Sequence, residues 1–269
     1  MRRSVMKKQS PIEKERRRLA RQEQAFLLAH GERESSALER LLEDRVPPGL
    51  RGTLDEAFFR AFRLLFEKGA GLIELSSSRE KLAKALEDRQ LAYEFWQDRR
   101  SLGSITQKAA GSGRLNGLLS GVAGLGLGVL GIGLPDIALF TALMLKCVYE
   151  TALNYGFDYR SDAEKQFVLT VIQGAMASGD ELYTADRRLN DWIALPEGER
   201  PPLGETQTLI RAAAAQLSGE LLYMKFLQGI PIVGAVGGAY DAVYMRRISR
   251  YAELKYRRRY CYSPLWRFD

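Results

Sequence analysis

The stretch GVAGLGLGVLGIGLPDIALFTALMLKCVYE, residues 121–150, decides how this chain is interpreted, because it carries almost no charge and is dense in glycine. Three structures suit such a stretch: a membrane span, a phosphate-binding loop, or closely packed helices inside a soluble protein. Each implies a different fold and a different function, and the flanking residues discriminate among them.

The phosphate-binding loop is the least favoured of the three. Residues 126–131 read GLGVLG and match the GxGxxG pattern of dinucleotide-binding folds, with Glu150 near the place of the ribose-binding acid. That pattern works only where the glycines follow a strand and open a helix. Pro135 would interrupt this helix, because an interior proline removes a hydrogen bond and clashes with the preceding turn. No strand pattern surrounds the stretch, so we set this interpretation aside.

The membrane interpretation is stronger. Residues 115–135 form 21 consecutive uncharged residues, about the length that spans a bilayer, but seven of them are glycines. Each glycine costs about 0.5–1 kcal/mol in a helix relative to alanine. A second apolar block, residues 226–240, has only 15 uncharged residues and an internal proline, which makes it too short to cross. GxxxG spacing at residues 117–121 and 124–128 favours close helix contact, in a bilayer or in a soluble core.

We therefore interpret the two blocks as glycine-rich apolar helical hairpins that pack face to face. Membrane insertion of residues 115–145, shallow or complete, is the alternative that the sequence leaves open. The helix-packing glycines would be Gly121, Gly124, Gly128, Gly131, Gly234 and Gly237.

Helical patterns dominate the rest of the chain, which predicts an all-α fold. Residues 11–29 place Ile12, Leu19 and Phe26 at seven-residue spacing, and Ser161 with Glu164 forms a capping-box pattern. Residues 155–156, Tyr-Gly, predict a helix end with the glycine in the left-handed conformation. The expected helices cover residues 11–29, 36–46, 53–68, 79–99, 136–154, 161–178, 205–227 and 244–260, with a loop at 196–204.

The charge is concentrated at the two ends of the chain. Residues 1–30 hold nine Lys or Arg against three Glu, and residues 246–269 hold eight against two acids, so the middle of the chain is acidic although the net charge is +7. We predict a basic helical arm at residues 1–45 and a helical domain at 46–269. Such ends suit anionic lipid head groups. The expected basic membrane patch comprises Lys14, Arg16, Arg17, Arg18, Arg257, Arg258 and Arg259.

The chain offers few groups for chemistry. It has one histidine, His30, and two distant cysteines without CxxC spacing, a composition that favours a reducing compartment and argues against a metal site or a histidine-based triad. Lys146 and Glu150 are four residues apart on one predicted helix and are expected to pair with each other. We predict no catalytic residues, no metal and no cofactor.

The glycines leave room for an apolar ligand beside aromatic and acidic side chains. The residues that would line such a lipid or apolar-ligand pocket are Asp136, Phe140, Tyr149, Glu150, Tyr155, Asp158 and Asp241.

Three segments, in this order, resemble the EcsC family of bacterial proteins. The first is Pro135-Asp136-Ile137, whose helix ends in Tyr155-Gly156-Phe157-Asp158. The second is the helix that begins DAEKQFVL at residue 162. The third is IPIVGAVG at residues 230–237, which leads to a terminal helix with a basic end. The resemblance covers about residues 54–260 and leaves out residues 1–45. Asp241 stands where the family pattern suggests a polar residue, often asparagine.

The resemblance implies a membrane-linked accessory role, because the family takes its name from an operon that also encodes an ABC transporter. We therefore expect a non-enzymatic, cytoplasmic protein that attaches to the inner face of the membrane through an anionic surface or a membrane protein, with a possible link to transport or secretion. A lipid-binding module, or a hydrolase that uses Asp136, Asp158 or Asp241, are the alternatives. No nucleic-acid-binding motif is present, and the oligomeric state is left open.

Overall fold

The structure is a computed structural model that describes residues 10–32, 49–68, 84, 135–227 and 239–263. These residues form seven α-helices, one 3-10 turn and no strand, so the predicted all-α fold is confirmed. The bounds of the elements are α1 Pro11–Gly31, α3 Leu50–Lys68, α8 Pro135–Asn154, α9 Asp162–Met176, α10 Gly179–Ala194, η2 Glu197–Glu199, α11 Thr206–Leu227 and α12 Ala239–Cys261.

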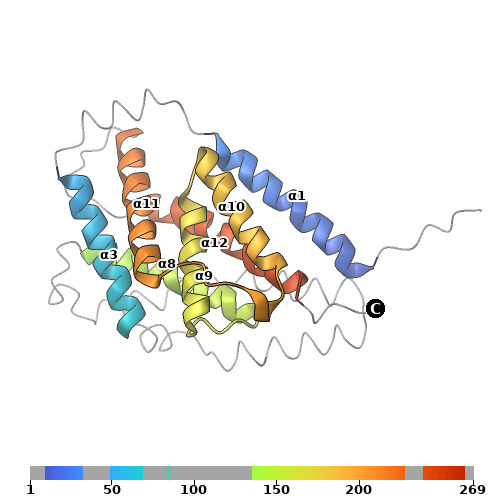
Figure 1. The fold of residues 1–269 in the computed structure, drawn as a ribbon. Coiled ribbons are helices and arrows are strands. Elements are labelled where there is room, and N and C mark those ends of the chain that lie inside the picture. The colour runs from blue at the N-terminus through green and yellow to red at the C-terminus, as the bar shows by residue number, and fades with distance from the viewer. Residues whose placement is uncertain (1–9, 33–48, 69–83, 85–134, 228–238, 264–269) are drawn as a thin grey trace, which may run out of the picture.

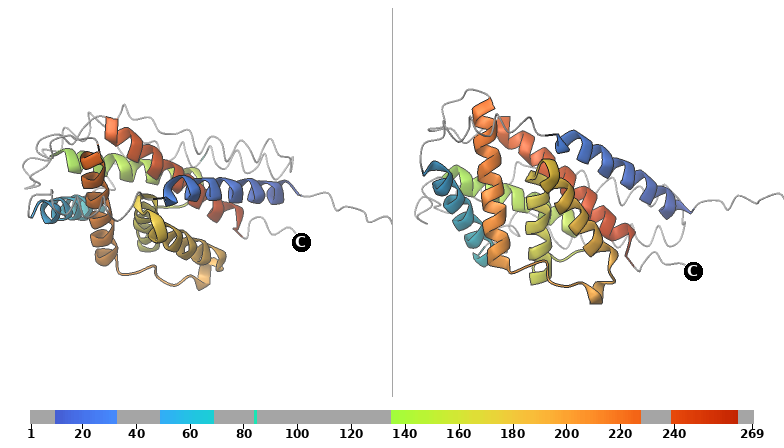
Figure 2. Two further views of the ribbon diagram at one scale, coloured as in Figure 1. Left: turned by 90° about the horizontal axis from the view of Figure 1, so that it is seen from above. Right: turned by 45° about the horizontal axis from the view of Figure 1, so that its top comes forward.

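The helices form two layers with one helix along the side. Helices α3, α11, α9 and α10 lie side by side in that order (Figure 1). Helices α8 and α12 pack together across the same face of this row, as the view from above shows (Figure 2, left). Helix α1 runs along α12 and also contacts α10. The C-terminal helix α12 is thereby enclosed by α8, α9, α10 and α1.

The N-terminus of helix α1 is capped by residues that are close to it in the sequence. The Ser10 hydroxyl accepts a hydrogen bond from the Glu13 amide at 3.2 Å, and the Ser10 amide donates to the Glu13 carboxylate at 3.0 Å. Pro11 occupies the first helical position, where its missing amide hydrogen costs nothing. The predicted seven-residue apolar spacing is confirmed, because Ile12, Leu19 and Phe26 are all buried.

Helix α8 is strongly apolar, and most of its side chains are buried. Its end is a Schellman motif: Gly156 has φ +85°, its amide bonds the Leu153 carbonyl at 3.0 Å, and the Phe157 amide bonds the Ala152 carbonyl at 2.9 Å. Among the described residues, Ile137–Asn154 is the one helical segment that is long and apolar enough to cross a membrane. Since 72% of that segment is buried inside the protein, it also has the character of a core helix.

The starts of α3 and α12 differ from the predicted ones, and α12 begins at Ala239 instead of residue 244. Helix α3 begins at Leu50 rather than at Thr53, whose hydroxyl instead donates to the Gly49 carbonyl at 3.0 Å inside the first turn. The helix itself is confirmed, and Ala57, Phe58, Ala61, Phe62 and Leu65 form its buried apolar face.

Helix α10 was not predicted. It is an amphipathic helix that begins directly at Gly179, a residue that the sequence suggests as a stop. Gly179 has φ +55° and separates α10 from α9, which ends three residues earlier. The helices predicted at residues 36–46 and 79–99, and the glycine-rich residues 115–134, lie outside the described residues, except for Lys84.

Candidate functional site

The most unusual feature of the described structure is the number of charged side chains buried around α12. Within this helix, the side chains of Glu253, Lys255, Arg257 and Arg259 are each at most 7% exposed. The acids that pair with the three cations of this set come from α1, α9 and α10. Ion pairs with three other helices therefore hold α12 in place. We call this set of ion pairs the α12 charge network.

Lys255 is the centre of the network. Its ammonium group is fully buried and lies 2.9 Å from Glu23 of α1, 2.6 Å from Asp186 of α10 and 2.8 Å from the side-chain oxygen of Asn190. The hydroxyl of Tyr251 donates to Asp186 at 3.1 Å. Every donor of the ammonium group therefore has an acceptor, which is the condition under which a buried charge is tolerated.

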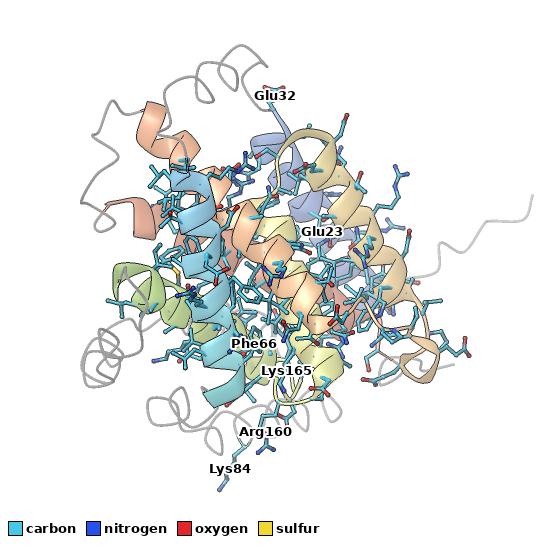
Figure 3. All side chains as sticks on the ribbon, turned by 60° about the vertical axis from the view of Figure 1, so that its left-hand side comes forward. Glu23, Glu32, Phe66, Lys84, Arg160 and Lys165 are labelled. Atoms are coloured by element: carbon cyan, nitrogen blue, oxygen red, sulfur yellow. The ribbon has the colours of Figure 1, made fainter. Side chains whose placement is uncertain are left out.

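Two arginines extend the network toward the N-terminal end of α1. Arg257 pairs with Glu15 of α1 and, at 3.2 Å, with Glu253 of its own helix. Burial lowers the pKa of Arg257, but the hydrogen bond that it donates to Glu15 and the charges of Glu15 and Glu253 outweigh burial and raise the pKa overall. Arg258 donates to Glu23 at 2.6 Å. Figure 3 shows Glu23 among the side chains that fill the space between the helices.

Arg259 forms the third part of the network, on the side of α9. Its guanidinium donates to Glu164 at 2.6 Å, and the Tyr256 hydroxyl donates to the same carboxylate at 2.7 Å. The guanidinium also lies over three aromatic rings, with centroid distances of 4.0 Å to Phe157, 4.9 Å to Phe167 and 5.3 Å to Trp192. Such cation–π contacts strengthen when they are withdrawn from water.

Glu164 was predicted to close a capping box at the start of α9, and it does only part of this. Ser161 accepts a hydrogen bond from the Glu164 amide at 3.2 Å, as predicted. The Glu164 side chain points instead into the core, toward Arg259 and Tyr256. The capping-box pattern therefore predicted the start of α9 correctly, but the Glu164 carboxylate binds Arg259 and Tyr256 in the core.

Arg257 and Arg259 do not belong to a surface patch. The sequence analysis assigned them to the basic membrane patch because they stand in a run of three arginines near the C-terminus. The structure contradicts this for both, since their side chains are 4% and 7% exposed and are paired with acids. Arg258 is 22% exposed and bonded to Glu23, so it is committed to the network as well.

Helix α1 carries a group of exposed basic side chains, whereas the basic C-terminal part of α12 is buried and the exposed arginines of α12, Arg246 and Arg250, lie nearer its middle. Lys14, Arg17, Arg18 and Arg21 are all exposed and follow one another at spacings of three, one and three residues. This spacing places them on one face of the helix, opposite the buried face of Ile12, Glu15, Leu19 and Glu23. We call these four residues the α1 basic face.

Arg16, the remaining basic residue predicted on α1, lies at the edge of this face. Both its Nε and its Nη2 donate to the Cys261 carbonyl, at 3.0 and 2.8 Å, which satisfies an orphan carbonyl at the end of α12. Its guanidinium lies 4.6 Å from the ring centroid of Tyr262. Arg16 therefore links the N-terminal half of α1 to the C-terminal end of α12.

The aromatic residues proposed to line an apolar-ligand pocket are packed against other rings. Tyr149 stacks on Tyr159 with centroids 4.2 Å apart, and Phe140 meets Phe58 edge-on at 6.5 Å. Tyr155 lies 5.7 Å from Tyr260, on α12. All three side chains are buried and contribute to the hydrophobic core. The apolar-ligand pocket stays a prediction.

Of the acids proposed for that pocket or for hydrolysis, the structure describes the side chains of Glu150 and Asp158, and each is paired with a basic residue near it in the sequence. Glu150 lies 3.6 Å from Lys146, which confirms the predicted ion pair. Asp158 is exposed and bonds Arg160, which points away from the helices (Figure 3). Asp136 and Asp241 stand in the first turns of α8 and α12, and the directions of their side chains lie outside the described structure.

Buried thiols and phenols near α12 are held protonated. Burial, followed by the charge of Glu15, raises the pKa of Cys261 to about 12. Burial likewise raises the pKa of Tyr251 and Tyr256 well above the ordinary value, and the neighbouring carboxylates Asp186 and Glu164 add to the effect. Among the described residues, no three His, Cys, Asp or Glu side chains cluster as a metal site would require.

The fold and the site define an all-helical protein with a charged, fully neutralised interior and a separate basic surface helix. The model of the EcsC protein family matches residues 10–261, and the chain therefore belongs to the EcsC family. The match begins at residue 10 and so includes α1, which contributes Leu19 and Phe26 to the common core. In this respect α1 differs from the separate arm that the sequence predicted. No curated protein and no solved structure matches the chain.

Proposed function

We propose that this protein is a non-enzymatic accessory protein that binds an anionic membrane surface through the α1 basic face. The observation that carries the proposal is the contrast between two groups of cations: Lys255, Arg257 and Arg259 of α12 are buried against interior acids, whereas α1 presents four exposed cations on one face. The residues of that face, Lys14, Arg17, Arg18 and Arg21, lie on one side of the helix, and the exposed Glu13 at its edge accepts a hydrogen bond from the Ser10 amide.

The expected strength of this attachment is modest and depends on salt. A Lys or Arg near an anionic leaflet contributes about 1 kcal/mol, so four of them give a reversible association. This attraction falls off within a Debye length, about 10 Å at 0.1 M salt and about 3 Å at 1 M. The resemblance to a family named from an operon that also encodes an ABC transporter supports the proposal that the protein acts at the cytoplasmic face beside a membrane complex.

Vesicle flotation tests the proposal. The full-length protein is floated with vesicles of neutral lipid alone and with vesicles that contain anionic lipid, at low and at high salt. We expect binding to the anionic vesicles at low salt and weaker binding as salt rises. Absence of binding to anionic vesicles at low salt would overturn the proposal.

A matched pair of variants assigns the binding to α1. The triple variant Lys14→Gln, Arg18→Gln, Arg21→Gln removes three charges from the α1 basic face and is expected to lose most of the binding. The control Arg51→Gln, Arg60→Gln, Arg63→Gln removes three exposed charges from α3, on the opposite side of the molecule (Figure 1). Equal losses in both variants would show that net charge, not α1, determines binding.

A further inference from the structure

The outward stripe of α1 does not end with its basic residues. Continuing from Arg21 at helical spacing, it passes through Ala25 and reaches Leu28, both of which are exposed. Leu28 is 64% exposed, more than any other large apolar side chain among the described residues. The same stripe is therefore basic along its N-terminal half and apolar along its C-terminal half.

A second exposed apolar side chain lies at the same end of α1. The Tyr183 side chain of α10 is 42% exposed and touches Gly31 so closely that a Cβ on this glycine would lie 2.6 Å from the phenol oxygen. Gly31 is three residues beyond Leu28 and therefore its neighbour on the helix surface. Tyrosine, with an apolar ring and a polar tip, suits the boundary between water and lipid.

The buried face of α1 determines which side of this helix is exposed to a binding partner. Glu15 and Glu23 stand on this face and are neutralised by Arg257, Lys255 and Arg258 of α12. If α1 turned over, these two acids would meet the anionic surface and repel it. The α12 charge network thus holds the basic and apolar halves of the outward stripe in one orientation.

From this arrangement we propose that Leu28, with Tyr183 beside it, enters the headgroup layer of an anionic bilayer and supplies the part of the binding that salt does not screen. The inference rests on the proposed function and deepens it, because it adds an apolar anchor to the electrostatic attachment. Helices that lie in the membrane interface combine these two contributions, buried apolar area and attraction to anionic lipid.

The two contributions are separated by measuring partition onto anionic vesicles at low and at high salt for the full-length protein. The variant Leu28→Gln keeps the size of the side chain and, at an exposed position, leaves the core intact. We expect it to reduce the partition coefficient by about tenfold at high salt, where the screened cations contribute little, and by the same factor or less at low salt. The control is Leu195→Gln, which changes an exposed leucine at the other end of α10 from Tyr183.

Each outcome of this experiment decides one of the proposals. If the wild-type protein shows no binding to anionic vesicles at any salt concentration, the proposed function fails. If the wild-type protein binds and Leu28→Gln partitions like the wild type at high salt, the basic face is sufficient and the anchor is rejected. If Leu195→Gln loses as much binding as Leu28→Gln, the effect is not specific to α1, and the anchor is rejected as well. A loss confined to Leu28→Gln supports it.

Discussion

Helices α1 and α12 are both strongly basic in sequence, yet they use their charges in opposite ways. On α1 the cations point outward and the two inward polar residues, Glu15 and Glu23, are acids. On the C-terminal part of α12 the cations Lys255, Arg257 and Arg259 are buried and pair with those acids together with Asp186 and Glu164, whereas Arg246 and Arg250 nearer its middle are exposed. Net charge along a sequence therefore says little about surface charge until it is known which face of each helix is covered.

The buried and the exposed cations should also contribute to different properties: the buried ones to stability, the exposed ones to binding. Removing one member of a buried ion pair leaves the other charge unpaired in the core, which costs about 3–5 kcal/mol, whereas an exposed charge contributes about 0–1 kcal/mol. Cations on α12 should therefore determine whether the protein folds, and cations on α1 should determine what the folded protein attracts. The predictions below test this division.

The largest effect is expected at Glu164, which neutralises Arg259 in the core. The substitution Glu164→Gln should lower the free energy of unfolding by about 3–5 kcal/mol, because it leaves a buried guanidinium without its acid. Urea denaturation measures the change. Glu197 is the matched control: it lies 3.7 Å from the same arginine but is 68% exposed, so Glu197→Gln should change stability by less than about 0.5 kcal/mol. Similar losses in both variants would contradict the account.

A smaller effect is expected at Glu23, although it contacts two cations. After Glu23→Gln, Lys255 still has Asp186 at 2.6 Å, and only Arg258, which is partly exposed, loses its acid. We expect a loss of about 1–3 kcal/mol in the same denaturation experiment. A loss as large as that of Glu164→Gln would show that Asp186 is no substitute for Glu23.

The smallest effect concerns alkaline pH and the tyrosines of α12. The folded state raises the pKa of Tyr251 and Tyr256 above the unfolded value of about 10, so their contribution is complete below pH 10 and declines above it. Each such tyrosine adds a slope of about 1.4 kcal/mol per pH unit to the loss of stability. Urea titrations between pH 9 and 11 should show a shallower decline for Tyr256→Phe than for the wild type. An unchanged slope would mean that this phenol ionises equally in both states.

Much of the fold was predictable from the sequence because helix patterns are local. Capping at Ser10 and Ser161, the glycine end of α8 and the apolar stripes of α1 and α3 each depend on residues within a few turns of one another. The EcsC family was likewise predictable, since it depends on the order of apolar motifs along the chain.

The α12 charge network was not predictable because its pairs between helices join residues far apart in the chain. Glu23 and Lys255 are separated by 232 positions, and Glu164 and Arg259 by 95. The local sequence of a run of arginines is the same whether their side chains are exposed to solvent or paired with buried acids. One signal was present: Glu15 and Glu23 stand on the face of α1 that carries Ile12 and Leu19, and an acid on an apolar face calls for a buried cation.

The central claim is that equal charge changes on the two basic helices have unequal consequences, and the urea-unfolding midpoints of Arg259→Gln and Arg18→Gln test it most directly. The account predicts a loss of about 3–5 kcal/mol for Arg259→Gln, which leaves Glu164 buried and unpaired, and a change within about 0.5 kcal/mol for Arg18→Gln. Equal midpoints for the two variants would contradict it.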